Sequence, residues 1–201
     1  MYRRQERKAL SHDEVHDLVE AEHFADKIGK KLNTAITIHP KLPDAYPDDI
    51  GRWLSTTFLN SLRTRSNRLG FGHYALYVRE SYEGDRREHV HLLLHVPDKE
   101  RSASEAMLKR WLPGQDGVLD VRRLSFRKDR FGRSINGFLT YLLKQMRPQA
   151  WWFLGKGVRR EAHCKCTGLP VAAVLGKRCG VSRTLSKATR HQHQGDIHVA
   201  V

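Results

Sequence analysis

Two consecutive strand-like segments joined by a short turn constrain the fold of this chain most strongly. Residues 73–82 contain three tyrosines and a valine, and residues 88–96 combine histidines with aliphatic side chains. The polar link at 83–87 contains Gly84-Asp85, which is typical of a hairpin turn. A two-stranded hairpin is only marginally stable in water without further strands or a helix. We therefore expect other elements to pack around it.

The segments that flank the hairpin alternate between helical and extended patterns. Ser11 and Glu14 have the spacing of a capping box, which marks the start of an amphipathic helix. The expected elements, in order, are a helix over 11–31, a strand over 33–39, a helix over 47–69, the hairpin, a helix over 102–112, a strand over 118–126 and a helix over 134–146. After the first helix, this β-α-β-β-α-β-α order predicts an α+β fold. We expect an antiparallel sheet of four to five strands with helices on one face.

The composition of the chain changes near residue 150. We expect a basic leader and N-terminal helix over 1–32, a main domain over 33–150, and a basic C-terminal extension over 151–201. The extension is rich in Gly, Lys and Arg, and we expect it to be partly disordered, above all from His191 onwards.

The charge of the chain favours a polyanionic partner. Lys and Arg number 36 against 22 acids, giving a net charge of +14. Such an excess raises the local concentration of nucleic acid and favours contacts with phosphates. A solvated charged face is the alternative for any single cation. The cations that could follow a DNA backbone are Arg63, Arg65, Arg68, Arg122, Arg123, Arg127, Lys128, Arg130 and Arg133, with Trp111, Trp151 and Trp152 as stacking surfaces.

Other features of the sequence bear on the compartment. The basic N-terminus is not followed by an apolar segment, and no run approaches the ~18 apolar residues that cross a bilayer. Three cysteines are too few for a disulfide framework. We expect a cytoplasmic protein without a membrane partner.

The second strand of the hairpin carries the sharpest pattern. Side chains alternate between the two faces of a strand. The residues Val90, Leu92, Leu94 and Val96 then form an apolar face, and His89, His91 and His95 point to the opposite one beside Leu93. Imidazoles at i and i+2 can share a metal ion. We therefore predict that His89 and His91 bind a metal, although polar residues on a solvated sheet face would give the same pattern.

The last predicted helix carries a candidate nucleophile. Tyr141 and Lys144 are spaced i and i+3, so they share one helix face. A phenol is a poor nucleophile at its usual pKa near 10, and a nearby ammonium or metal ion stabilises both the phenolate and the attacked phosphate. Tyrosine is also common at the edge of a helical core, so this pair alone does not decide the function.

Together, these features resemble the HUH superfamily of rolling-circle replication initiators, relaxases and single-tyrosine transposases. The resemblance spans residues 33–146, with a first motif at 34–39, the His89 and His91 strand, and the helix with Tyr141. It implies an RRM-like palm in which His89 and His91 bind Mg²⁺ or Mn²⁺. It also implies that Tyr141 is the nucleophile and that Lys144 positions the metal or the phosphate.

The third metal ligand is less constrained by the sequence. Replication-type members of the superfamily often use an acid on the strand before the histidine pair, and Glu80 has that position. We favour Glu80, with Glu83, Glu88 and His95 as competitors. A carboxylate suits Mg²⁺ or Mn²⁺.

The resemblance implies an endonuclease that nicks and rejoins single-stranded or hairpin DNA through a 5′-phosphotyrosyl intermediate. Gln145 occupies the position of the second tyrosine of two-tyrosine members, which indicates the single-tyrosine type. No helicase segment is evident, so we expect rolling-circle replication initiation of a small mobile element, with host proteins such as a helicase as partners. The alternatives are a single-tyrosine transposase and a non-catalytic DNA-binding regulator. Histidine-triad nucleotide hydrolases have a similar strand, but Leu93 stands where they carry a third histidine.

A second cluster of soft ligands lies near the C-terminus. His163, Cys164, Cys166 and Cys179 could form a small zinc site. The Cys-x-Cys spacing differs from that of the usual zinc knuckle, so isolated thiols in a loop are the alternative.

Overall fold

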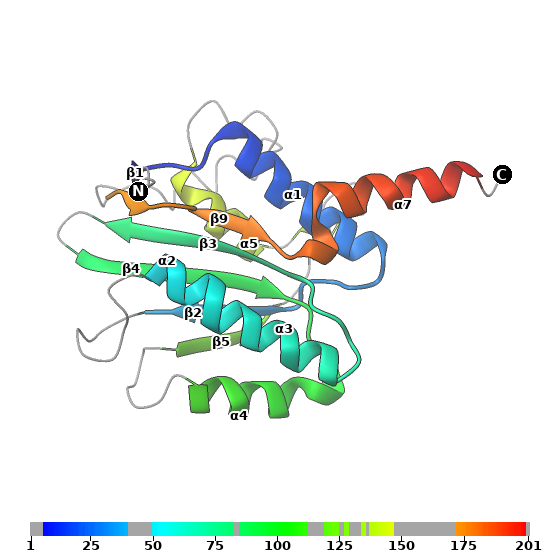
Figure 1. Cartoon of the computed structure of the whole chain (residues 1–201), viewed down its shortest axis with the longest axis horizontal. Coiled ribbons are helices and arrows are strands. Elements are labelled where there is room, and N and C mark those ends of the chain that lie inside the picture. The colour runs from blue at the N-terminus through cyan, green and yellow to red at the C-terminus, as the bar shows by residue number, and fades with distance from the viewer. Residues whose placement is uncertain are drawn as a thin grey trace.

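A five-stranded antiparallel sheet with helices on both sides forms the centre of the molecule in a computed structural model (Figure 1). The structure describes residues 6–39, 50–82, 85–111, 119–124, 127–128, 134–135, 137–146 and 172–199. The strands of the sheet are β2 (Thr34–Ile38), β3 (Ala75–Tyr82), β4 (Asp85–Leu94), β5 (Leu119–Arg123) and β9 (Cys179–Val181). Their spatial order is β5-β2-β4-β3-β9, and every neighbouring pair is antiparallel.

Of the helices in the described part of the chain, all but the last lie where the sequence pattern predicts them, with differences at their ends. They are α1 (His12–Lys27), α2 (Ile50–Trp53), α3 (Leu59–Arg68), α4 (Arg101–Trp111), α5 (Gly137–Leu142) and α7 (Lys187–Val199). A π-helical turn (Leu54–Phe58) joins α2 to α3, and a 3₁₀ turn (Leu143–Gln145) follows α5. Ser11 and Glu14 form the predicted capping box at the start of α1.

The connections between the strands form a split β-α-β arrangement. The chain runs from β2 through α2 and α3 to β3, turns back into β4, and then runs through α4 to β5. β2 lies between β4 and β5, so each crossover passes over one intervening strand. The predicted α+β fold with an antiparallel sheet of four to five strands is confirmed.

The two faces of the sheet have separate apolar cores. Val90, Leu92 and Leu94 of β4 pack on one side with apolar residues of α2, α3 and α4. Leu93 faces the other side and packs with residues of α1 and α5. The expectation of helices on one face holds for the crossover helices but is wrong for the whole fold. Because residues such as Ala35 and Leu93 make the second face apolar, α1 and α5 are needed to cover it.

The C-terminal part of the chain belongs to the same packed structure. β9 pairs with β3, and the short strand β8 (Val174–Leu175) pairs with β1 (Glu6–Arg7). α7 contacts α1 through an ion pair between Arg190 and Asp17, with 2.5 Å between Nη2 and Oδ1. The described residues of the C-terminal extension therefore pack on the same sheet as the main domain. Residues 191–199, where we expected disorder, form the end of α7 in the structure. Residues 147–171 lie outside the described part.

The helix predicted over 134–146 is shorter than expected. Ser134–Ile135 forms a strand, β7, that pairs with β6 (Arg127–Lys128). The helix α5 begins only at Gly137, so it presents a single turn and a half before the 3₁₀ turn. Tyr141 lies in α5, and Lys144 lies in the 3₁₀ turn that follows it.

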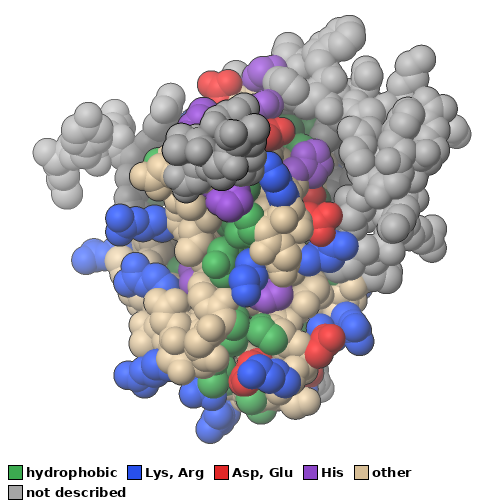
Figure 2. Space-filling model, turned by 90° about the vertical axis from the view of Figure 1, so that its right-hand side faces the viewer, with side chains coloured by type: hydrophobic (Ala, Val, Ile, Leu, Met, Phe, Trp, Pro, Cys, Tyr) green, Lys and Arg blue, Asp and Glu red, His purple; other side chains and the backbone are tan. Residues whose placement is uncertain are grey.

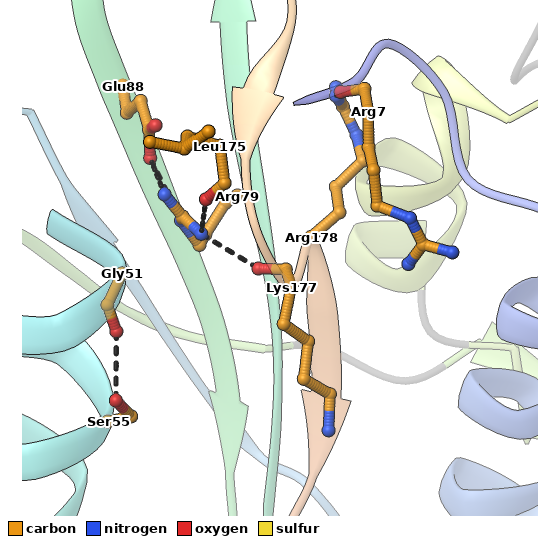
Figure 3. Close-up of polar contacts among 8 residues, drawn as sticks. All are labelled: Arg7, Gly51, Ser55, Arg79, Glu88, Leu175, Lys177 and Arg178. Atoms are coloured by element: carbon orange, nitrogen blue, oxygen red, sulfur yellow. Dashed lines mark hydrogen bonds and ion pairs between the residues drawn. The ribbon is translucent and has the colours of Figure 1, made fainter. Parts of the chain in front are cut away.

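A buried arginine fixes the position of β3 (Figure 3). The Arg79 side chain, 3 % exposed, donates through Nε to Glu88 at 2.8 Å and through Nη1 to the carbonyls of Leu175 and Lys177, at 3.0 and 2.8 Å. A Cβ atom at Gly51 would lie only 2.6 Å from Nη1 of Arg79, so α2 approaches the guanidinium through a residue without a side chain. Arg79 thus holds β3, β4 and the β8–β9 segment together.

The cations are spread over the surface rather than gathered in one patch on the face seen in Figure 2. This view looks at the end of the molecule from which α7 extends. Lys and Arg side chains appear around the described surface, and several His side chains gather in its upper part. On this face, the distribution of the cations does not locate a binding site.

Candidate active site

Strand register brings the histidine pair beside Glu80. β4 lies between β2 and β3, with His89 opposite Glu80 of β3 and His91 opposite Thr37 of β2. His91 is 1 % exposed, and His89 is half-buried. Side-chain alternation places His91 and Leu93 on the same face of the sheet, as predicted, and that face is covered by α1 and α5.

The His91 ring is held from both sides. Its Nδ1 lies 3.0 Å from Thr37 Oγ1, and its Nε2 lies 3.2 Å from Glu80 Oε2. These two contacts fix the orientation of the ring.

Glu80 also contacts the predicted lysine. Its Oε2 lies 2.7 Å from Lys144 Nζ, and the two side chains are 0 % and 5 % exposed. Burial alone would raise the pKa of Glu80, but the hydrogen bonds and charges of His91 and Lys144 outweigh it and hold that pKa below its usual value. The carboxylate is therefore ionised at neutral pH.

Tyr141 completes the cluster from α5. Its ring centroid lies 5.3 Å from that of His91, at an interplanar angle of 87°. Lys144 Nζ lies 3.6 Å from the Tyr141 ring centroid, and the Phe138 ring stacks with the Tyr141 ring at a centroid distance of 5.6 Å. Since side chains at i and i+3 eclipse in a 3₁₀ turn, the turn at Leu143–Gln145 suits this overlap of lysine and tyrosine.

One residue of this region was not singled out from the sequence. The His39 ring lies 4.5 Å from that of His89 and 6.4 Å from that of His91, measured between centroids. The sequence places His39 at the end of a strand but does not give the register of that strand against β4. The sequence does contain one signal for His39. Thr37 and His39 are two residues apart on one strand, so their side chains point to the same face, and pairing of β2 with β4 makes this the face of His91.

The competitors for the third ligand position do not join the cluster in the described part of the chain. His95 lies beyond the other end of β4, with Nδ1 at 2.9 Å from the carbonyl oxygen of Lys31. Glu88 bonds to Arg79 on the opposite face of β4. Glu83 lies outside the described residues. Glu80 is the acid that the structure brings against His91.

The donors at this site match a divalent cation in part. The 3.2 Å between His91 Nε2 and Glu80 Oε2 is close to the separation of about 3 Å between adjacent ligands of one octahedral ion. The His89 ring instead lies against His39. Among the described residues, no three His, Cys, Asp or Glu side chains are arranged to hold a metal ion. A third ligand would therefore have to turn toward His91 and Glu80.

The suggested zinc ligands are only partly described. Cys179 lies in β9 within the apolar core, 4 % exposed, and burial raises the pKa of its thiol to about 12. Such a thiol is protonated, whereas zinc binds the thiolate. His163, Cys164 and Cys166 lie outside the described residues.

Comparison of the chain with protein-family models, with curated proteins and with solved structures finds no match. None of the described helices is long and apolar enough to span a membrane.

Proposed function

We propose that the chain is an endonuclease and strand transferase that cleaves single-stranded DNA with Tyr141 as the nucleophile. The observation that supports this most is the meeting of Glu80, His91 and the Tyr141–Lys144 pair. They come from β3, β4 and α5 with its following turn, yet lie within direct contact of one another. These are four of the five residues that the resemblance to HUH enzymes implies. The contacts of Tyr141 with His91 and of Lys144 with Glu80 join residues far apart in the sequence, whereas Tyr141 and Lys144 are spaced i and i+3.

The proposed reaction is a transfer of one phosphodiester. The Tyr141 oxygen forms a bond to phosphorus, and the bond from phosphorus to the 3′ oxygen breaks. The phenolic proton leaves the tyrosine, and the departing 3′ oxygen takes up a proton. The products are a 5′-phosphotyrosyl DNA end and a free 3′-hydroxyl, and attack by a 3′-hydroxyl in the reverse direction rejoins the strand. Lys144 provides positive charge beside the reacting tyrosine.

A divalent ion, Mg²⁺ or Mn²⁺, would be held by His91, Glu80 and His89. When bound, it would draw charge from the non-bridging oxygens of the phosphate. Thr37 and Lys144 fix the two buried ligands, because Thr37 contacts the second ring nitrogen of His91 and Lys144 contacts the Glu80 carboxylate. His89 would have to turn from His39 to complete the set.

The biological role that we infer is initiation of rolling-circle replication for a small mobile element, with single-stranded or hairpin DNA as the substrate. A single-tyrosine transposase would use the same chemistry. Gln145 supports the single-tyrosine type in both cases.

A non-catalytic DNA-binding role is the second candidate. The burial of Glu80 and His91, 0 % and 1 % exposed, favours it, because a network closed to solvent also serves simply to stabilise the fold. In that case, no covalent product forms.

A covalent-adduct assay separates the two roles. A pool of single-stranded DNA with a randomised centre is labelled at the 3′ end and incubated with the full chain and Mn²⁺. We expect a labelled band of protein size that survives denaturation, and no such band with 5′-labelled DNA. Tyr141→Phe and chelation should each abolish it, whereas Tyr77→Phe, which removes a different tyrosine hydroxyl, should retain it. An adduct that persists in Tyr141→Phe would contradict the nucleophile, and one that survives chelation would contradict the metal.

A further inference from the structure

A polar groove lies between α3 and α4, on the face of the sheet opposite the candidate active site. Both helices pack on the core that contains Val90 and Leu92, whereas Tyr141 packs on the core that contains Leu93. The groove has a volume of about 540 Å³. This is within the size range of ligand-binding pockets.

The lining of the groove is cationic and rich in hydroxyl groups. Arg65 and Arg68 of α3 face Arg110 of α4 across it, Trp111 lies at the end of α4, and Thr64 is one of several Ser and Thr side chains on the α3 wall. Among the described residues, no Asp or Glu lines it. Three guanidinium groups without a lining carboxylate favour an anionic occupant.

The Arg65 side chain lines both this groove and a smaller adjoining cavity. Its Nε is buried and has no hydrogen-bond partner within the described part of the chain. A buried donor on a charged group is costly to leave unsatisfied. The nearby acid Glu105 shares an adjoining smaller cavity with Arg65, but its carboxylate pairs with Lys109 at 3.0 Å.

We propose that this groove binds the phosphodiester backbone of single-stranded nucleic acid. Arginine forks recognise phosphate oxygens through paired hydrogen bonds, and the hydroxyls of the α3 wall are further donors. Trp111 is half-buried and offers a ring on which an unpaired base can stack. The combination of cations, hydroxyls and one aromatic ring suits a single strand better than an acidic protein segment.

This site goes beyond the proposed nicking reaction, because it lies across the sheet from Tyr141 and needs no chemistry. If the chain also cleaves DNA, the groove would hold a part of the strand away from the cleaved phosphate. Strand binding by the groove and adduct formation by Tyr141 can therefore fail separately.

Fluorescence anisotropy with labelled oligodeoxythymidine, in chelator so that binding stays non-covalent, tests the proposal. The groove variant is Arg65→Gln/Arg68→Gln/Arg110→Gln. The matched control is Arg63→Gln/Lys99→Gln/Lys187→Gln, which removes the same charge from exposed residues outside the groove. Because dispersed positive charge also attracts DNA, the test is the difference in affinity between the two triple variants.

We expect the groove variant to bind oligodeoxythymidine about tenfold or more weakly. The plot of the logarithm of the association constant against the logarithm of the salt concentration should become less steep by about 2, because each lost phosphate contact removes about 0.7 from the slope. The control should change affinity less than about threefold. The double variant Arg68→Gln/Arg110→Gln alters only exposed side chains and should lower the slope by about 1.4. Because it leaves the half-buried Arg65 in place, a loss of binding in this variant is not caused by misfolding at Arg65.

Equal losses in the groove and control variants would overturn the proposal, because they indicate general charge attraction. So would an unchanged slope in the groove variants. Groove-dependent binding of polyglutamate without groove-dependent binding of oligodeoxythymidine would also overturn it, and would assign the groove to an acidic protein partner.

Discussion

The ammonium of Lys144 lies 3.6 Å from the centroid of the Tyr141 ring. The same nitrogen is 2.7 Å from Glu80 Oε2, so one buried cation joins the carboxylate of β3 to the tyrosine of α5. A cation over an aromatic face is stabilised by the ring quadrupole, and the effect grows when both groups are removed from water. Lys144 is therefore expected to contribute both to the stability of the fold and to the reactivity of the site.

The ion pair between Glu80 and Lys144 should show strong energetic coupling. Either Glu80→Gln or Lys144→Met removes one member of this buried ion pair, which costs about 3–5 kcal/mol in the free energy of unfolding at neutral pH. The double variant removes both charges and should be more stable than the sum of the two losses implies. Urea denaturation of the four proteins measures the coupling, and strictly additive losses would contradict a direct pair.

Lys144 should also affect the rate of adduct formation with single-stranded DNA. Lys144→Met removes the positive charge beside Tyr141, and we expect the rate to fall about a hundredfold, as for loss of one electrostatic donor in other active sites. Lys144→Arg keeps the charge and should retain part of the rate. Lys109→Met, on an exposed face of α4, is the matched control. A wild-type rate in a folded Lys144→Met protein would exclude a role for this residue in the reaction.

Glu22 of α1 should make stability depend on pH. Burial, aided by the nearby Asp26, raises the pKa of Glu22 from its ordinary value of 4.5 to about 7. Between these values the folded protein holds a proton that the unfolded chain releases, so the free energy of unfolding falls as pH rises from 4.5 to 7. Glu22→Gln removes this dependence and should be more stable than the wild type above pH 7, by about 3 kcal/mol.

The measurement for Glu22 is the difference in unfolding free energy between wild type and variant across this pH range. Other titrating groups cancel in that difference. Glu20→Gln, an exposed neighbour on the same helix, should show no such trend. A constant difference between wild type and Glu22→Gln would show that the folded-state pKa of Glu22 is not raised.

The fold could be predicted from the sequence wherever a local pattern determined the structure. Alternation in residues 88–96 assigned Val90 and Leu92 to one face and His91 to the other, and the structure has this arrangement. The capping box at Ser11 predicted the start of α1 to the residue. Both are local signals, because strand parity and helix capping depend on neighbours within a few residues.

Features that depend on tertiary packing could not be predicted in the same way. The register between β2 and β4 cannot be read from the sequence of either strand alone, so the contact between His39 and His89 was not predicted. β9 has only three residues, Cys179–Val181, and lies in a segment rich in Gly, Lys and Arg. Such a short strand gives no recognisable sequence pattern, so its position at the edge of the sheet was not predicted. Glu80 was favoured through a resemblance, and its contact with Lys144 required the placement of α5.

Identification of the residue that carries DNA tests the central claim most directly. The adduct formed with Mn²⁺ is digested with nuclease and trypsin, and the modified peptide is sequenced by mass spectrometry. The account predicts a nucleotide phosphate on Tyr141, within the peptide that ends at Lys144. A nucleotide on any other residue, or a correctly folded protein that forms no adduct with the randomised single strands, would contradict it.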